Sequence, residues 1–465
     1  MPTPRPIAAL LIAALTLVSA ACGGYSQRLA EVRMDVQTGN VEGAVDRVTE
    51  LVLTGEAGEN PEAFDLPLLL LERGALQQAL QRHREAVADF TQADPMLETL
   101  DLSSDGVGNA ATYLWSESKS LYRPPVYEKL MVNAMALSSY LALGEYGSAR
   151  VEARRIGVLV DYFETTELGD HPMLGAAAYL AGLAMELGGE RESALRFYID
   201  AYARADAPGL AEAVARLGMR STLRGNPQVV RARESLGLEA DDDPPEGAAQ
   251  EAVIIAWSGL APRREPQRFP IGAVIAWYRV NTTYVMTDAQ QASLNRAVAE
   301  DLLTWINFPV LVVTRNTVGR ISVDVDGRTV DAPRVADLES FAIAQWEQDR
   351  PGIAFAAITR ALTRIVAREG VQAIGRAADS GNGVGQAVGF LAGLAAQGAM
   401  QAADQPDTRT WTFMPAYLHV TRVPVSAGTH TLTVRGAGKG AWAGQQVTID
   451  VPEGGAGVAT VRFLR

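Results

Sequence analysis

The segment from Leu121 to Phe163 shows the clearest pattern of apolar positions in the chain. On both sides of a turn at Leu143-Gly144-Glu145, apolar residues recur at steps of three and four, which is the spacing of amphipathic helices. The small residues Ala149 and Ala153 allow two antiparallel helices to approach closely. The pattern predicts a helical hairpin that hides its apolar face by stacking on neighbours. The apolar positions are Leu130, Ala134, Leu137 and Leu141, then Ala149, Ala153, Ile156 and Val160.

The same arrangement of small and aromatic positions recurs over residues 27–238. Steps of 12, 4 and 3 residues separate its members, as they separate the packing positions of a tetratricopeptide repeat. The alanines of successive sets lie 42, 63 and 45 residues apart, more than the roughly 34 of a tight array. Residues 22–238 are therefore predicted to form an irregular tetratricopeptide-like α-solenoid, with insertions between hairpins. The sets are Gly74, Ala86, Phe90, Ala93; Leu137, Ala149, Ala153, Ile156; Gly182, Ala194, Tyr198, Ala201; and the partial set Ala44, Val48, Leu51.

A change of composition then marks the second half of the chain. Residues 239–250 combine three aspartates with two prolines and a glycine, which is typical of a linker. Residues 251–465 predict an α+β domain, with helices near Asp288–Leu303 and Val335–Asp349 and an antiparallel β-sandwich-like unit at its end. The predicted strands are Val253–Trp257, Gly272–Val280, Val310–Thr314, Ile321–Val325, Tyr417–Val423, Thr429–Val434, Gln446–Val451 and Val458–Leu464.

A Gly-rich helical insert at residues 352–403 interrupts these strands. Its second half, Val384–Ala403, carries no charge and places Gly385, Gly389 and Gly393 on one helical face. A buried hairpin packed on the β domain is one interpretation, and helix–helix contact between chains is another, because small residues favour close approach. Membrane insertion is a third, although its glutamines are costly in lipid.

The N-terminus has the pattern of a signal peptide over residues 1–21, with Arg5 before the apolar run Ile7–Val18. Cys22, the single cysteine of the chain, follows Ser19-Ala20-Ala21. Small residues before a cysteine resemble the lipobox of bacterial lipoproteins, in which the thiol is acylated, for example with palmitate. An ordinary signal with an incidental cysteine is the alternative. Gly23 in place of an aspartate implies the outer membrane, facing the periplasm.

Composition narrows the chemistry. A net charge of −13 on 465 residues argues against nucleic acid as a partner, because phosphate binding needs a basic surface. The four histidines, His83, His171, His419 and His430, show no metal-ligand spacing, and the chain offers no cysteine besides Cys22. Gly436–Gln445 fails the phosphate-loop pattern and predicts a hairpin loop. We therefore expect neither a metal nor another cofactor, and no enzyme activity.

Side chains for binding a partner are suggested by the central hairpin. Tyr122, Tyr127, Tyr140 and Tyr146 are candidates to line an exposed groove, although tyrosines at helical spacing are also common packing residues. Arg150 and Arg154, with Glu152 and Arg155, form either an ion-pair network between repeats, with Glu128 and Asp161 as candidate partners, or a solvated helix face.

Several strings of residues resemble a family of uncharacterised bacterial envelope lipoproteins with tetratricopeptide-like repeats and a C-terminal β-rich domain. The resemblance implies an envelope location and a two-part layout, and it supplies no catalytic or binding residues. The strings are Tyr122 with Pro124-Pro125-Val126-Tyr127-Glu128, Met131-Val132-Asn133, Ala149–Arg155, Gly259-Leu260-Ala261-Pro262, and Asp407-Thr408-Arg409-Thr410-Trp411 with Pro415-Ala416.

Together these features predict a non-enzymatic lipoprotein on the periplasmic face of the outer membrane. It would act as a scaffold or adaptor that binds envelope proteins, because stacked helical repeats usually bind other molecules. One alternative is an assembly factor for an export or surface-polymer machine that forms a homo-oligomer through Gly385, Gly389 and Gly393. Another alternative is a regulator of peptidoglycan synthesis.

Overall fold

The computed structural model describes residues 24–56, 62–97, 122, 124–239, 242, 250–270, 272–274, 276–277, 305–354, 357–358, 406–438 and 444–464. The predictions for the signal peptide, for Cys22, for the helix near Asp288–Leu303 and for Gly385, Gly389 and Gly393 lie outside these residues. Most of the 239–250 linker does too. These predictions therefore stay predictions.

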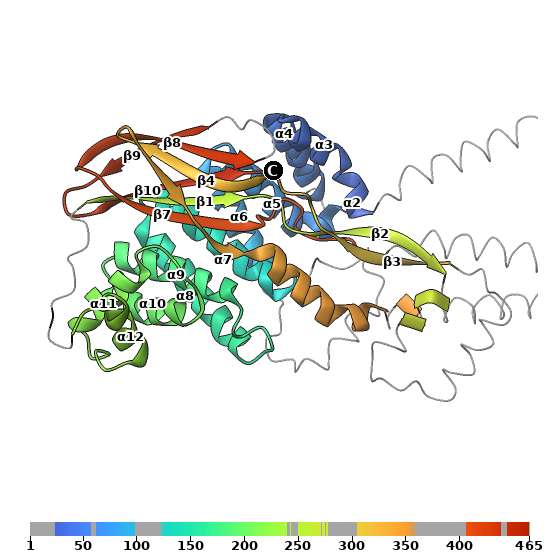
Figure 1. The fold of residues 1–465 in the computed structure, drawn as a ribbon. Coiled ribbons are helices and arrows are strands. Elements are labelled where there is room, and N and C mark those ends of the chain that lie inside the picture. Colours follow the sequence, from blue (N-terminus) through green and yellow to red (C-terminus); the bar gives the residue numbers. More distant parts are fainter. Residues whose placement is uncertain are drawn as a thin grey trace, which may run out of the picture.

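The chain combines helices in its N-terminal half with strands in its C-terminal half, as predicted (Figure 1). The helices are α2 (Tyr25–Arg28), α3 (Ala30–Thr38), α4 (Val41–Glu56), α5 (Glu62–Ala79), α6 (His83–Met96), α7 (Val126–Ala142), α8 (Tyr146–Glu164), α9 (Pro172–Leu187), α10 (Arg191–Arg204), α11 (Leu210–Met219) and α12 (Pro227–Ser235).

One backbone feature repeats between paired helices. Gly39, Gln81, Gly144 and Gly189 follow α3, α5, α7 and α9, and each has a positive φ, of 89°, 62°, 70° and 81°. A left-handed residue ends a helix tightly and lets the chain reverse, and glycine takes this conformation without strain. Each stands five residues before a fully buried alanine of the next helix, so the turn and the packing position keep a fixed spacing. The alanines are Ala44, Ala86, Ala149 and Ala194.

The predicted packing positions pair a small residue with a large one. A Cβ added to Gly74 would lie 2.6 Å from the Phe90 ring, and one added to Gly182 would lie 2.5 Å from the Tyr198 ring. These distances are below van der Waals contact, so each glycine makes room for the aromatic ring of the next helix. In the α7–α8 pair the sizes are reversed: the large Leu137 takes the place of the glycine, and the small Ala153 takes the place of the aromatic residue. Both are fully buried. The predicted packing positions are buried, except Leu51, which is only partly buried.

The strands form two four-stranded sheets and one two-stranded ribbon. The orders are β10-β1-β7-β6, β5-β4-β8-β9 and β2-β3. β10 pairs parallel with β1, so the first sheet is mixed and the prediction of an antiparallel unit is wrong there. The strands are β1 (Glu251–Ser258), β2 (Arg263–Pro270), β3 (Trp305–Val312), β4 (Val318–Val325), β5 (Arg328–Ala332), β6 (Arg334–Asp337), β7 (Tyr417–Pro424), β8 (Gly428–Gly438), β9 (Gln445–Val451) and β10 (Ala456–Phe463).

Most predicted strands are confirmed, and five elements differ from the prediction. β2, β5 and β6 escaped the search for apolar runs because they are rich in charged residues. Residues 272–274 and 276–277 are helical where Gly272–Val280 predicted a strand. The predicted helix at Val335–Asp349 begins only at residue 338, because Arg334–Asp337 pairs with β7. β8 and β9 pair antiparallel on both sides of the predicted hairpin loop.

The first sheet lies between the helices and the second sheet. Along β1, the side chains alternate between two cores, as the period-two geometry of a strand requires. Val253, Ile255 and Trp257 belong to the core shared with the helices. Ala252, Ile254 and Ala256 belong to the core shared with β4, β8 and β9. The result is a layer of helices, a central sheet buried on both faces, and an outer sheet (Figure 1).

The central sheet covers helices that are buried on nearly every side. In α7 and α9 nearly every residue is buried, which is the pattern of a helix enclosed in a core. β10 contacts α5 and α7, and β6 contacts α9. Three hydrogen bonds tie the helices to the sheet, two of them at Ser138 of α7. The Trp257 indole nitrogen donates to the Ser138 hydroxyl at 3.1 Å, the Thr460 hydroxyl donates to the Ser138 carbonyl at 2.7 Å, and the Tyr146 hydroxyl at the start of α8 donates to the Ala456 carbonyl at 3.4 Å.

In the described part of the chain, each helix is too short or too polar to cross a lipid bilayer.

The glycine–aromatic packing leads to a test with a matched control. Gly182→Ala places a methyl group against the Tyr198 ring and should lower the free energy of unfolding by about 1–3 kcal/mol. Gly147→Ala, in α8, adds the same methyl group where nothing lies within 4 Å. It should leave stability unchanged or raise it slightly, because alanine favours helices. Denaturant unfolding of both variants measures this, and equal stability of the two would contradict the packing.

Candidate functional site

The most distinctive chemistry of the molecule lies where the helices meet the C-terminal half. Two groups of buried polar residues sit there. The first group keeps residues 407–414 in place. This segment, here called the strap, leads into β7. The second surrounds Arg422 on β7 itself. Both join residues far apart in the sequence, so they decide how the two halves fit together.

Glu72, on α5, binds the backbone of the strap. Its two carboxylate oxygens accept the backbone N–H groups of Thr412 at 2.6 Å and of Phe413 at 2.8 Å. The Tyr25 hydroxyl, from α2, donates to the same carboxylate at 2.9 Å. All of these groups are buried, and Glu72 is fully so. One side chain thus fixes a turn of the strap against α5 and against the first described helix.

Glu128, on α7, plays the same part for the preceding residue of the strap. One of its oxygens accepts the Trp411 backbone N–H at 3.3 Å, and the other accepts the Tyr122 hydroxyl at 2.5 Å. The Trp411 ring lies edge-on to Phe90 at 5.9 Å between ring centroids. Two helices, α5 and α7, therefore bind the strap, each through one carboxylate.

Charged residues close the outer end of this group. Asp65 pairs with Arg28 and lies 3.5 Å from the Arg409 guanidinium. Arg409 also donates to Asp407 at 3.0 Å and lies over the Tyr122 ring, 5.6 Å from its centroid. Two of the strings that carried the family resemblance, Tyr122–Glu128 and Asp407–Trp411, thus meet at one place.

Burial governs the ionisation of the two glutamates. It raises the pKa of Glu72 to about 7, although three hydrogen bonds from donors favour the charged form. It raises the pKa of Glu128 to about 7 as well, against the opposing effect of Tyr122. Both carboxyl groups therefore titrate near neutral pH, well above the usual range of a glutamate.

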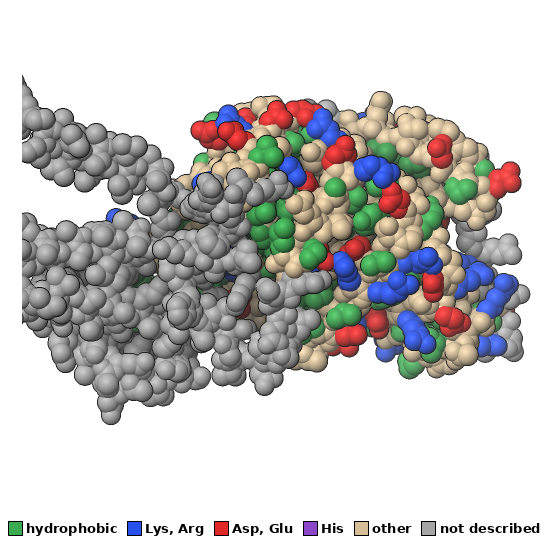
Figure 2. Space-filling model, turned by 180° about the vertical axis from the view of Figure 1, so that it is seen from behind, with side chains coloured by type: hydrophobic (Ala, Val, Ile, Leu, Met, Phe, Trp, Pro, Cys, Tyr) green, Lys and Arg blue, Asp and Glu red, His purple; other side chains and the backbone are tan. Residues whose placement is uncertain are grey.

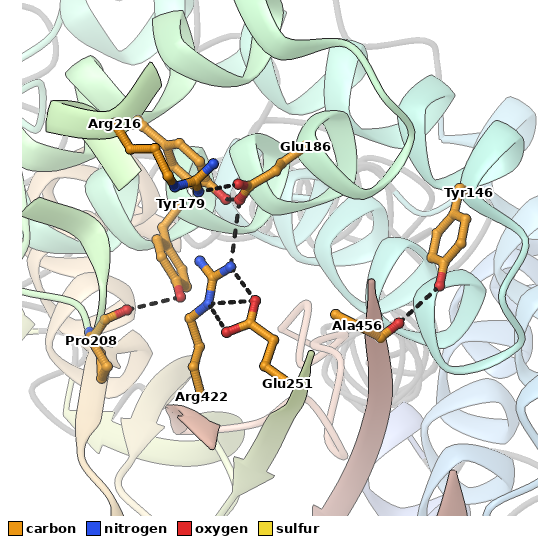
Figure 3. Close-up of polar contacts among 9 residues, drawn as sticks. Tyr146, Tyr179, Glu186, Pro208, Arg216, Glu251, Arg422 and Ala456 are labelled. Atoms are coloured by element: carbon orange, nitrogen blue, oxygen red, sulfur yellow. Dashed lines mark hydrogen bonds and ion pairs between the residues drawn. The ribbon is translucent and has the colours of Figure 1, made fainter. Parts of the chain in front are cut away.

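The second group is an ion cluster between β7 and the helices (Figure 3). Arg422 makes two-pronged hydrogen bonds to Glu251 of β1, with distances of 2.5 to 3.2 Å, and lies 3.5 Å from Glu186 of α9. Glu186 also accepts from Arg216 of α11 and from the Tyr198 hydroxyl, the latter at 2.7 Å. Burial alone would raise the pKa of Glu186, but the two arginines outweigh it and hold that pKa below its usual value.

The structure supports the packing interpretation of the four candidate tyrosines rather than the exposed groove. Tyr122 and Tyr127 are buried, so the expectation that they are exposed is wrong. Tyr122 is held by Glu128, and Tyr127 packs edge-on against Phe341. Tyr140 and Tyr146 are half-buried, and their hydroxyls contact Thr91 at 3.2 Å and Ala456 at 3.4 Å. In the described part of the chain, the four tyrosines therefore contact other residues of the protein, as packing residues do.

Some charged residues of α8 form the predicted ion-pair network, and others lie on a solvated helix face. Arg150 donates to the Gly188 carbonyl and to Glu190, both at 3.1 Å, and so links α8 to the next hairpin. Arg155 pairs with Asp94 of α6, which also binds Lys129 of α7. These residues form the network between hairpins. Arg154 is exposed, as the solvated-face interpretation expects. Glu128, named as a possible arginine partner, binds Tyr122 and Trp411 instead.

Among the described residues, no group of three or more His, Asp or Glu side chains is placed to hold a metal ion. The histidines serve separate local roles. His171 accepts the Met173 N–H at the start of α9, and His419 contacts the Ser258 hydroxyl at 3.1 Å and the Ala332 carbonyl at 3.2 Å. No family model matches this chain, and no curated protein matches its sequence.

The raised pKa of Glu128 predicts a pH effect on stability. Because the folded-state pKa of about 7 lies above the ordinary value near 4.5, the stabilisation by the protonated group is fully present below about pH 4.5 and is lost as pH rises through about 7. Glu128→Gln keeps an acceptor for Trp411 and a partner for Tyr122 but does not titrate. Between about pH 5 and about pH 8, wild type should lose on the order of 2 kcal/mol more than this variant.

Urea unfolding at each pH measures this difference. Burial lowers the pKa values of His83 and His419 to about 4. Their titration contributes equally to wild type and to the variant. Glu72→Gln is a contrasting variant, because its amide N–H₂ must face a strap N–H. We expect it to cost about 1–3 kcal/mol at about pH 8, and a different amount at lower pH because the pKa of Glu72 itself is about 7. Identical pH profiles for wild type and Glu128→Gln would contradict the assignment.

The ion cluster predicts a large effect of removing Arg422. Arg422→Met leaves Glu186 and Glu251 buried beside an apolar group and should cost about 3–5 kcal/mol. The control is Arg435→Met, which removes the arginine paired with Asp324 on the outer sheet, where the Arg435 side chain is 54% exposed. That pair should contribute about 1 kcal/mol or less. A loss of stability no larger for Arg422→Met than for this control, in equilibrium unfolding, would refute the cluster's role.

Proposed function

We propose that this protein is a non-enzymatic adaptor of the cell envelope, anchored through Cys22 to the periplasmic face of the outer membrane. In this proposal the helical half is an irregular tetratricopeptide-like solenoid and the two packed sheets are its β-sandwich-like partner. The contacts described above support a rigid body, because each buried carboxylate holds one segment of the chain against another. The N-terminal sequence pattern supports the anchor.

The proposal moves the partner-binding surface from the inner face of the helices to their outer face. The central sheet covers the inner face of α5, α7 and α9. On the outer side, α8, α10 and α12 follow one another. A Cβ added to Gly157 of α8 would lie 3.1 Å from the Phe197 ring of α10, and the Tyr202 hydroxyl of α10 donates to Ser235 of α12 at 3.3 Å.

This outer face carries basic and apolar side chains. Arg154, Arg196 and Arg231 are exposed on the three successive helices. On α8, Val151 and Val158 flank Arg154 and are 44% and 58% exposed. Figure 2 shows Lys and Arg side chains gathered over the helical end of the molecule, in the lower right of the view. Arginine beside apolar groups is typical of protein interfaces.

The observation that carries the proposal is this set of exposed arginines beside exposed valines, on a protein with a net charge of −13. Unlike charges attract, so it fits an acidic protein surface that also offers apolar groups. We call it the arginine face, made of Arg154, Arg196 and Arg231 with Val151 and Val158. A tether at Cys22 would confine such contacts to proteins of the periplasm and the outer membrane.

A charge-reversal comparison tests this function. The triple variant R154E/R196E/R231E should fold with an unchanged melting temperature, because all three side chains are exposed, and it should lose the envelope proteins cross-linked to wild type in intact cells. The control R268E/R315E/R320E makes the same change of charge at exposed positions of the β half. It should keep those partners. Loss of the same partners from both variants, or from neither, would overturn the proposal.

A further inference from the structure

Arg462 occupies an unusual place in the central sheet. It lies on β10, whose Val461 and Phe463 side chains point into the core shared with the outer sheet. By the alternation of a strand, Arg462 therefore points toward the helices and the strap. Its neighbour on β1 is Trp257. The side chain is only 1% exposed, which makes it one of the most deeply buried charged groups among the described residues.

The contacts of Arg462 leave most of its guanidinium unpaired. One Nη donates to the Phe413 carbonyl of the strap at 2.6 Å. The Nε and the other Nη have no hydrogen-bond partner, and no carboxylate of the described residues pairs with it. Burial lowers the pKa of Arg462 to about 9, and the group therefore stays charged at neutral pH.

Two other arginines, one buried and one half-buried, show what is missing at Arg462. Arg409 has Asp407 and Asp65 beside it, and Arg422 has Glu251 and Glu186. A buried charge without a counter-ion is strongly unfavourable, whereas water can satisfy hydrogen bonds but not the charge itself. The environment of Arg462 therefore calls for a negative group that the described residues do not supply.

A second unpaired donor lies on the same strap. The indole nitrogen of Trp411 is buried and has no partner, two residues before the carbonyl that Arg462 binds. Both Arg462 and Trp411 offer N–H groups and therefore select an acceptor. Because Arg462, Trp411 and Phe413 are buried almost completely, the acceptor must be small.

We propose that Arg462, with the strap at Trp411 and Phe413, forms an internal binding site for a small anion such as a carboxylate, a phosphate or a halide. The anion neutralises the guanidinium and joins β10 to the strap. Since the strap is already fixed to α5 and α7, occupancy of this site stabilises the joint between the two halves of the molecule. This inference is independent of the proposed function.

Thermal unfolding of the purified full-length protein in detergent tests the site. Sodium acetate, phosphate and chloride are each titrated into a zwitterionic buffer of low salt. At least one anion should raise the melting temperature of wild type in proportion to the logarithm of its concentration above the dissociation constant, by about 3 °C at about a hundred times that constant. Arg462→Met, which has a similar length and no charge, should lose this rise. Arg320→Met, at an exposed position of β4, should keep it.

Two additions make the outcome decisive. Arg462→Lys keeps a positive charge and should respond more weakly than wild type, which separates loss of the charge from loss of the fold. Native mass spectrometry detects an anion that copurifies, as a mass present in wild type and absent from Arg462→Met. The same rise of melting temperature with anion concentration in Arg462→Met, or a wild type with neither a response nor a bound mass, would overturn the proposal.

Discussion

The structure depends on one constraint: α7 and α9 have almost no solvent-exposed side, so other elements must cover them on all sides. α7 and α9 are buried around almost their whole circumference, so a single neighbouring layer cannot satisfy them. The hairpin partners α8 and α10 cover one side, and the central sheet covers another. Removal of apolar surface from water is the main favourable term in folding. The two halves of the chain are therefore parts of one core, which extends from α2 to β10.

Apolar contact alone would let the sheet slide on the helices, and the polar groups remove that freedom. Arg422 must reach Glu251 and Glu186 together, while Glu72 and Glu128 must meet consecutive N–H groups of the strap. A misplaced sheet would leave these groups buried and unpaired, which is costly. We infer that they act chiefly to select one arrangement.

Local features of the fold could be predicted from the sequence. The spacing from Gly144 to Ala149 repeats at Gly189 and Ala194, because one turn geometry and one packing position are fixed by neighbouring residues. The apolar runs of β1 and β10 also predicted strands. Their parallel pairing could not be foreseen, because about two hundred residues separate them and no local pattern records the partner.

The same limit applies to the site. Tyr122 looked like an exposed anchor because tyrosine suits both interfaces and cores. The burial of Tyr122 depends on the strap, in which Trp411 lies 283 residues after Glu128. Glu72, Glu186 and Arg422 carried no signal at all, since a charged residue in an amphipathic helix or strand ordinarily faces water. The family resemblance did mark Glu128 and Arg409 without saying that they lie close together.

Native-state hydrogen exchange on the intact protein, in rising denaturant, tests most directly whether the two halves form one body. If the central sheet and the helices share one core, amides of α7 and α9 and those of β1 and β10 exchange through one opening with the same free energy. If β1 and β10 stay protected while α7 and α9 open separately, the two halves are independent and the account is wrong.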